Sequence, residues 1–228
     1  NNNGLYGVYR STNGGTTWTQ RHGASPNLLD WSTNGSGSGG QAWYDLAIAV
    51  SPLDKDVVLT GGVNVWRSNN GGSSFALSGH WYGGGGVSFV HADHHWMIFK
   101  PGTGQVYAGC DGGGYKSGNS GMNNSWVARN QGLSITQYYK IGTTEADTTL
   151  TIAGAQDNGT HLNDHGWDKV GGGDGMDCAI SAADGNTMYR SIYYGDFDKS
   201  TNGGITFNAP FNLPPAGTGN WVTPFLAS

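Results

Sequence analysis

The sequence predicts an all-β protein assembled from repeated antiparallel strands. Its 228 residues include 41 glycines, 9 tryptophans and 11 tyrosines, whereas charged residues make up only 12%. Short aromatic-rich stretches alternate with Gly- and Asn-rich turns, a pattern typical of strands rather than helices. One turn phrase also recurs along the chain, which indicates a repeated structural unit.

The recurring phrase has the form Ser-x-Asn-Gly-Gly followed by an aromatic residue. Clean copies run through residues 11–18, 68–75 and 200–207, and a looser copy covers 117–126. Asn side chains accept hydrogen bonds from nearby backbone N–H groups, and glycine adopts positive φ without steric cost. The phrase therefore predicts a hairpin turn whose final aromatic residue is anchored in a core.

This phrase resembles the Asp-box (BNR) repeat, with Asn13, Asn70, Asn119 and Asn202 at the position that names the box. The resemblance implies a β-propeller of four-stranded antiparallel blades, in which each box joins the third and fourth strands. The same box occurs in sialidases, xyloglucanases, sortilin-type receptors and photosystem assembly factors. It therefore indicates fold more strongly than function.

The boxes place the strands in chain order. Residues 5–10 and 16–21 flank the first box as a third and a fourth strand, and the Gly/Ser-rich residues 27–41 predict a long surface loop. Four whole blades follow, with strands at 44–50, 57–61, 63–67 and 74–77; at 95–100, 105–109, 114–116 and 126–129; at 135–143, 149–155, 160–162 and 167–170; and at 176–181, 187–192, 196–199 and 205–208. Residues 221–226 look like the first strand of another blade.

By this count both ends of the chain stop inside a blade. We therefore expect residues 1–228 to form a single propeller region that is part of a larger propeller, rather than a small five-bladed ring with imperfect closure. No signal peptide is visible at Asn1, which we interpret as a mature or trimmed chain.

Charge and hydropathy exclude two classes of partner. The net charge is −5 and the sequence pI is about 5.7, with no basic stripe, so nucleic-acid binding is not expected. No apolar run reaches the length of a membrane span. The two cysteines, Cys110 and Cys178, allow one disulfide or two small buried thiols, and the sequence does not decide between them.

Further phrases tighten the resemblance. They are Tyr44-Asp45-Leu46-Ala47, His91-x-Asp93-x-His95, Asp111-Gly112-Gly113, Gln156-Asp157-Asn158-Gly159 and Gly172-Gly173-Asp174-Gly175. Nearly the whole chain resembles large secreted bacterial propeller proteins that often carry a type IX sorting domain and are grouped with sortilin-type (VPS10) propellers. The resemblance implies secretion or a cell-surface location but no particular activity, and the sorting domain is absent from this sequence.

His91, Asp93 and His95 form a candidate metal site. Alternate residues of a strand face the same side, so all three side chains could meet on zinc or a similar ion, with His94 pointing away and exposed. The competing interpretation is that they hydrogen-bond neighbouring loops.

Acids beside glycines form a second candidate set. Asp111, Asp157 and Asp174 could ring the mouth of a channel and attract Ca²⁺, or each could cap the glycine turn beside it, and we favour capping.

Glycoside hydrolysis needs two carboxylates across the scissile bond, for which Asp93, Asp111, Asp157 and Asp174 are candidates. A sialidase is disfavoured, because arginines are few and the single glutamate, Glu145, lies in a loop. Trp31, Trp43, Trp81, Tyr82 and Trp96 could stack sugar rings, or fill blade cores.

The sequence thus favours a secreted propeller with a non-catalytic role. That role is either to bind a glycan or an extracellular protein, or to form part of a cell-surface assembly. A xyloglucanase-like hydrolase with paired aspartates is the alternative.

Overall fold

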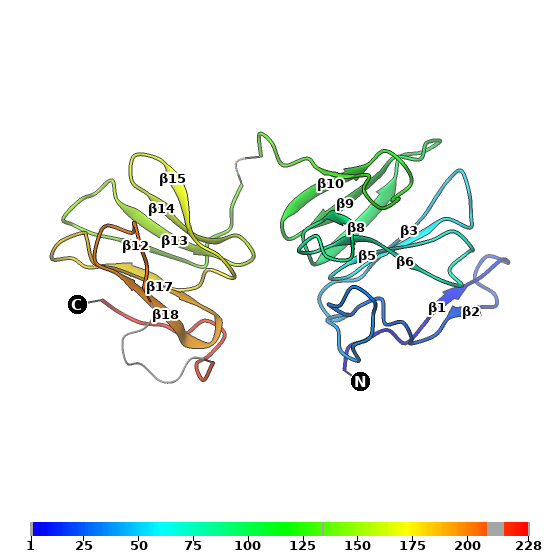
Figure 1. The fold of residues 1–228 in the computed structure, drawn as a ribbon, viewed down its shortest axis with the longest axis horizontal. Helices are drawn as coiled ribbons and strands as arrows, with labels where there is room; N and C mark the ends of the chain where they lie inside the picture. The colour runs from blue at the N-terminus through cyan, green and yellow to red at the C-terminus, as the bar shows by residue number, and fades with distance from the viewer. Residues whose placement is uncertain (1, 134, 209–216, 228) are drawn as a thin grey trace. The chain divides into compact units, whose positions relative to one another are not determined.

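The computed structural model describes residues 2–133, 135–208 and 217–227 (Figure 1). Among these residues the structure is all-β, apart from one 3₁₀ turn at Tyr193–Gly195. No helix in the described part of the chain has the length and apolarity to cross a membrane. The chain divides into two compact units, Asn1–Leu133 and Ser134–Ser228, which are described separately below.

The largest sheet of the first unit is a meander. It consists of β3 (Ala47–Val50), β4 (Val58–Gly61), β5 (Val65–Ser68) and β6 (Ala76–His80), with neighbours antiparallel. The short strand β7 (Ser88–Phe89) extends it and pairs in parallel with β6, an addition that the repeat did not predict.

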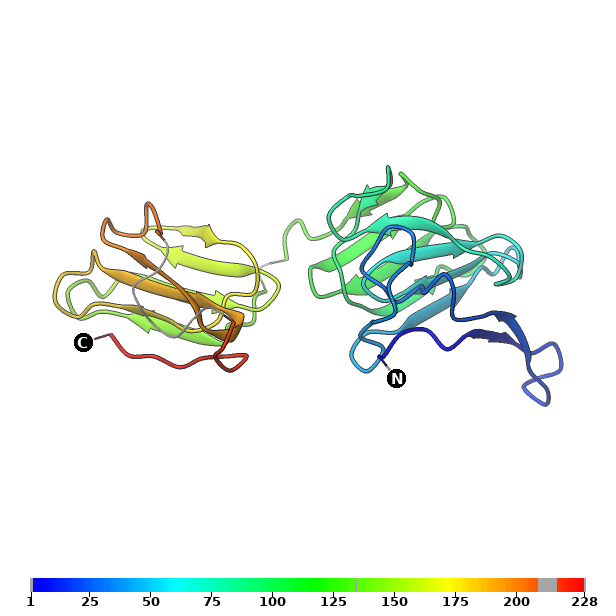
Figure 2. The same cartoon turned by 60° about the horizontal axis from the view of Figure 1, so that its bottom comes forward.

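A second meander follows in the same unit. Its strands are β8 (His94–Phe99), β9 (Val106–Cys110), β10 (Gly113–Ser117) and β11 (Trp126–Ala128). The first phrase lies in a separate two-stranded sheet, in which β1 (Val8–Arg10) pairs with β2 (Thr19–His22). This hairpin lies at the periphery of the unit in both views (Figures 1 and 2).

The second unit also begins with a four-stranded meander. It contains β12 (Lys140–Thr143), β13 (Thr151–Ala155), β14 (Gly159–Asn163) and β15 (Trp167–Gly171). Sheet order therefore follows chain order in both units, as the repeat predicts.

The last sheet has three strands, β16 (Cys178–Ile180), β17 (Met188–Ile192) and β18 (Asp196–Ser200). The predicted fourth strand at 205–208 is reduced to an isolated bridge between Lys199 and Asn208. The strand predicted at 221–226 is wrong, because no ladder forms there.

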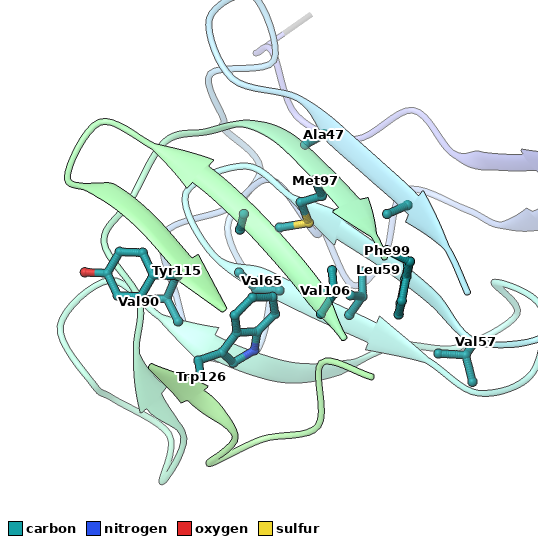
Figure 3. Close-up of a cluster of buried hydrophobic side chains, with 12 residues drawn as sticks. Ala47, Val57, Leu59, Val65, Val90, Met97, Phe99, Val106, Tyr115 and Trp126 are labelled. Carbon is teal, nitrogen blue, oxygen red and sulfur yellow. The ribbon is translucent and has the colours of Figure 1, made fainter. Parts of the chain in front are cut away.

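A cluster of buried apolar side chains forms the core of the first unit (Figure 3). Strand alternation turns Ala47 and Ala49 of β3 inward, together with Met97 and Phe99 of β8. Trp126 completes the cluster, and its indole N–H donates to the Ser78 hydroxyl at 2.9 Å, so that this buried polar atom is satisfied.

The repeated turn has the geometry that its residues predict. In the second copy the side-chain amide oxygen Oδ1 of Asn70 accepts the backbone N–H groups of Ser73 and Ser74 at 3.1 and 3.0 Å. Gly71 and Gly72 have φ of 68° and 83°, where a side chain would be strained. In the loose copy the Ser117 hydroxyl accepts the backbone N–H groups of Asn119 and Gly121. The hydrogen bonds described at Asn119 involve its backbone atoms only.

The surface loop expected at residues 27–41 is partly a buried segment. Leu28 and Leu29 are buried, and the Asn27 side chain donates to the carbonyl oxygens of Gly37 and Gly39 at 3.0 and 2.7 Å. The buried amide of Asn27 thus satisfies two backbone carbonyl groups of the loop. The polar composition of residues 27–41 gave no indication that part of the segment is buried.

Both cysteines are free thiols. Cys110 is half-buried and Cys178 is buried, which is where small thiols pack as apolar groups.

Ser68→Ala should destabilise the protein more than Ser11→Ala. The buried Ser68 hydroxyl accepts the N–H of Gly72 at 2.9 Å, whereas water can replace the hydroxyl at the more accessible first turn. Loss of a buried partner costs about 1–3 kcal/mol, and we expect less than about 1 kcal/mol for Ser11→Ala. Urea unfolding of both variants measures the difference, and equal destabilisation would contradict this account.

Candidate functional site

A β-bulge positions the first functional side chain. In the β8–β9 pairing, His94 lies opposite Cys110 and Trp96 opposite Gly109, so His95 is the extra residue. A bulge bends its strand and re-aims a side chain. The His95 Nε2 atom consequently lies 2.6 Å from Oδ1 of Asp111, which follows β9.

His94 is fully buried, and its predicted exposure is wrong. Its Nδ1 atom lies 2.8 Å from the Gly62 carbonyl oxygen, and its Nε2 has no partner among the described residues. Burial lowers the pKa of His94 to about 4, so the ring is neutral at physiological pH.

Asp93 breaks the strand on which the predicted metal site depends. Its φ is 67°, and β8 begins only at His94, so His91, Asp93 and His95 do not alternate along one strand. His91 instead packs against Gly112 in the turn after β9. The pair that the structure does bring together is Asp93 and Asp111, which have carboxylate oxygens within 4.8 Å of one another.

Tyr44 links this acidic pair to an aromatic surface. Its hydroxyl donates to Oδ2 of Asp111 at 2.6 Å, and its ring meets His95 edge-on at 4.9 Å between centroids. The Trp43 ring lies 5.5 Å from that of Tyr44 and is 74% exposed. An accessible indole therefore contacts the tyrosine that orients the Asp111 carboxylate.

Asp45 lies behind this surface with only 1% of its area exposed. The Gln41 side chain donates both to Asp45, at 3.3 Å, and to Asp93. Burial is the main cause that raises the pKa of Asp45 to about 7; the Gln41 hydrogen bond opposes this shift, and the charge of Asp93 adds to it. We call these residues, Gln41, Trp43, Tyr44, Asp45, Asp93, His95 and Asp111, the aspartate–histidine site.

The remaining predicted acids lie in the second unit. Asp174 Oδ1 accepts the backbone N–H of Asp157 at 2.9 Å, and Asp157 itself has φ of 63°. Asp174 thus caps a backbone N–H of the turn at Asp157, 17 residues away, rather than the glycine turn beside it.

The predicted aromatic groove divides into separate groups. Trp81 and Tyr82 cluster with Trp31 and the buried His80; the Trp81 and Tyr82 rings are 4.9 Å apart, and the Trp81 indole N–H donates to the Trp31 carbonyl at 3.3 Å. Only Trp43 contacts the aspartate–histidine site through a described ring pair, while Trp96 is exposed on β8.

Sequence reasoning assigned no role to Gln41, Tyr44 or Asp45. The phrase Tyr44-Asp45 at the start of the strand predicted at 44–50 was a usable signal, since polar residues at strand ends often line sites. Gln41 carried none, because its bridging depends on Asp93, which is 52 residues away.

The zinc ion predicted at His91, Asp93 and His95 and the Ca²⁺ predicted at Asp111, Asp157 and Asp174 stay predictions. Asp93, His95 and Asp111 supply the oxygen and imidazole donors that such ions take. Elemental analysis of the purified protein checks both.

Comparisons with known proteins show likeness only at the level of solved structures. No family model matches the chain, and no curated protein matches it. A GH74 enzyme of Niastella koreensis is 14% identical over 89% of this chain and 37% of its own, with a TM-score of 0.37. A GH74 xyloglucanase of Xanthomonas campestris is 18% identical over 90% and 34%, with a TM-score of 0.36.

YCF48 of Cyanidioschyzon merolae is 14% identical over 90% of this chain and 78% of its own, with a TM-score of 0.33. The chain spans about a third of the length of the two GH74 enzymes. Values of this size transfer no activity, ligand or partner to this chain.

Asp45→Asn should change how stability depends on pH. Between about pH 4 and 7 the unfolded Asp45 carboxyl is ionised while the buried one, with its pKa of about 7, keeps its proton. The native state then binds more protons, so this residue makes the free energy of unfolding fall as pH rises. The total effect is at most about 4 kcal/mol, because one pKa unit corresponds to about 1.4 kcal/mol.

The buried His94 acts in the opposite sense. Its folded-state pKa of about 4 lies below the ordinary 6.5, so its contribution rises with pH across that interval. Urea unfolding of wild type and Asp45→Asn at several pH values isolates the Asp45 term as the difference between the profiles. A difference that is constant from pH 4 to 7 would show that Asp45 is not buried in protonated form.

Proposed function

We propose that this chain is a portion of a secreted or cell-surface Asp-box β-propeller that binds a glycan at the aspartate–histidine site without cleaving it. The single observation that carries the proposal is the exposed Trp43 ring against Tyr44, whose own ring meets His95 and whose hydroxyl donates to Asp111. The propeller assignment is supported by the repeated turn, which joins the third and fourth strands of both meanders in the first unit.

Glycan recognition requires an apolar platform beside fixed polar groups. The C–H face of a sugar ring packs on an aromatic ring, and its hydroxyls donate to carboxylate and amide oxygens. Trp43 offers the platform, and Asp93, Asp111 and Gln41 offer the polar atoms. Because Tyr44, His95 and Gln41 already hold the carboxylates in place, little ordering is needed on binding.

An extracellular protein is the other partner that the sequence suggests. We favour the glycan because the accessible part of the site combines one flat indole with several acceptors, rather than a broad apolar patch.

Trp43→Ala should weaken glycan binding about tenfold or more, which corresponds to about 1.4 kcal/mol. The ring is 74% exposed, so its removal should leave stability unchanged. Calorimetric titration with xyloglucan oligosaccharides, and with cello-oligosaccharides as the unbranched comparison, measures the affinity. Trp18→Ala is the matched control, because Trp18 is 63% exposed in the first turn and has no described contact with the site. Equal affinity of the Trp43 variant and wild type would contradict the proposal.

A glycoside hydrolase is the second candidate function, and one observation favours it. Asp93 and Asp111 have oxygens within 4.8 Å of one another, and the carboxyl groups of retaining glycosidases lie about 5–5.5 Å apart. Asp45, with its pKa of about 7, also has the protonation state that a general acid needs at neutral pH.

If the protein is a hydrolase, Asp111→Asn should lower the release of reducing ends from xyloglucan by at least about 100-fold, as loss of acid–base catalysis does. The thermal unfolding midpoint of the same variant serves as the control for folding. No release by the wild-type protein would reject this second candidate and leave the binding proposal in place.

A further inference from the structure

The β1–β2 hairpin carries a basic pocket that is separate from the aspartate–histidine site. The pocket has a volume of about 200 Å³ and is lined by Arg10, Thr12, Thr17, Thr19 and Arg21. Its lining thus consists of two guanidinium groups and three hydroxyls, all of which donate hydrogen bonds. Among the five lining residues there is no carboxylate.

Strand geometry brings these side chains to one face. Arg10 of β1 pairs directly with Thr19 of β2, and Arg21 follows two residues later on the same strand. Residues two apart in a strand face the same side, so Thr19 and Arg21 lie beside Arg10. Thr12 and Thr17 continue the face into the first repeated turn.

Contacts with the neighbouring sheet fix both arginines. Arg10 Nη1 donates to Oδ1 of Asp56 at 2.8 Å, and Arg21 donates from Nε and Nη2 to the carbonyl oxygens of Gly71 and Asn70 at 3.1 and 3.0 Å. Gly71 makes room for this arrangement, because a Cβ there would overlap Arg10 Nη1. A guanidinium has five N–H donors, so each arginine keeps donors for a ligand.

The local charge is positive in a protein of net charge −5. Asp56 is the carboxylate that faces Arg10, and the hydrogen bond from Arg10 lowers the pKa of Asp56, which therefore stays ionised. Lys55 lies 3.6 Å from the same carboxylate. Asp54, which accepts the backbone N–H of Asp56 at 2.9 Å, is a second carboxylate nearby, so two negative charges stand against Arg10, Arg21 and Lys55.

The hydroxyl groups add donors without adding charge. The Thr17 hydroxyl accepts the Asn13 amide at 2.9 Å, which leaves its own proton to donate outward. No hydrogen bond in the described part of the chain engages the hydroxyls of Thr12 or Thr19. Water or a ligand must satisfy them.

We propose that this pocket binds a tetrahedral oxyanion, a sulfate or phosphate group that is either free or an ester on a glycan. Planar guanidinium groups recognise such anions through paired N–H donors, and threonine hydroxyls complete the coordination. The hairpin lies at the periphery of its unit, where a group on a large ligand can reach it (Figure 2). The proposed oxyanion pocket shares no residue with the proposed glycan site at Trp43, so the two proposals stand or fall separately.

The experiment is a titration of the isotopically labelled 228-residue chain with sodium sulfate, followed by NMR, against sodium chloride at equal ionic strength. Sulfate should shift the amide signals of the β1–β2 hairpin saturably. Arg21→Gln should weaken binding at least tenfold, and Thr19→Val, which keeps the β-branched shape, about threefold. Identical shifts with chloride would overturn the proposal, as would an affinity of Arg21→Gln within twofold of wild type.

Arg67→Gln is the matched control, because Arg67 stands before the second turn as Arg10 does before the first and donates to the Ser120 carbonyl at 2.9 Å. Arg67→Gln should leave sulfate binding unchanged, and an equal loss would overturn the proposal by showing an unspecific charge effect.

Glucose 6-sulfate and glucose distinguish the two sources of the oxyanion, which are a free anion and an ester on a glycan. Tighter binding of glucose 6-sulfate than of inorganic sulfate supports an ester ligand, and equal binding supports a free anion. The thermal unfolding midpoint of Thr19→Val shows that the hairpin still folds.

Discussion

The buried serine hydroxyl of the repeated turn is the interaction on which the arrangement of strands depends. Ser68, Ser117 and Ser200 each accept a glycine N–H at 2.9–3.0 Å, and these hydroxyls are almost completely buried. The turn then packs on a neighbouring sheet: a Cβ on Gly121 would lie 2.6 Å from Leu59, and one on Gly204 would lie 2.6 Å from Leu162. A local turn motif is thereby coupled to the apolar core.

Irregular features of this regular scaffold create the aspartate–histidine site. The left-handed backbone of Asp93 and the bulge at His95 interrupt β8 at its start, and together they direct two polar side chains toward the end of β9. Burial then shifts the pKa values of two neighbouring groups in opposite directions, upward for Asp45 and downward for His94. It favours the protonated form of Asp45 and the uncharged form of His94, so a polar cluster is buried with less net charge than its composition suggests.

The strands flanking the repeated turns were predictable because their periodicity is local, and most lie within a few residues of their expected limits. Errors arose where long-range contacts decide. Residues 27–41 have a loop composition, yet Asn27 folds them inward by bonding to Gly37 and Gly39. The arrangement assumed for His91, Asp93 and His95 was unbroken alternation along one strand, and the positive φ of Asp93 interrupts it.

The sequence alone determined the all-β class, the order of the strands and the repeated turn, since each follows from glycine conformations, Asn side-chain geometry and alternation over a few residues. It also contained both arginines of the β1–β2 hairpin, although nothing local marked them as one face of a pocket. Only the tertiary structure decided which acids meet. Asp93 and Asp111 are 18 positions apart, and Tyr44 lies 67 positions from the carboxylate to which it donates. Such pairings, and the pKa shifts that burial causes, depend on how sheets pack, which no short stretch of sequence encodes.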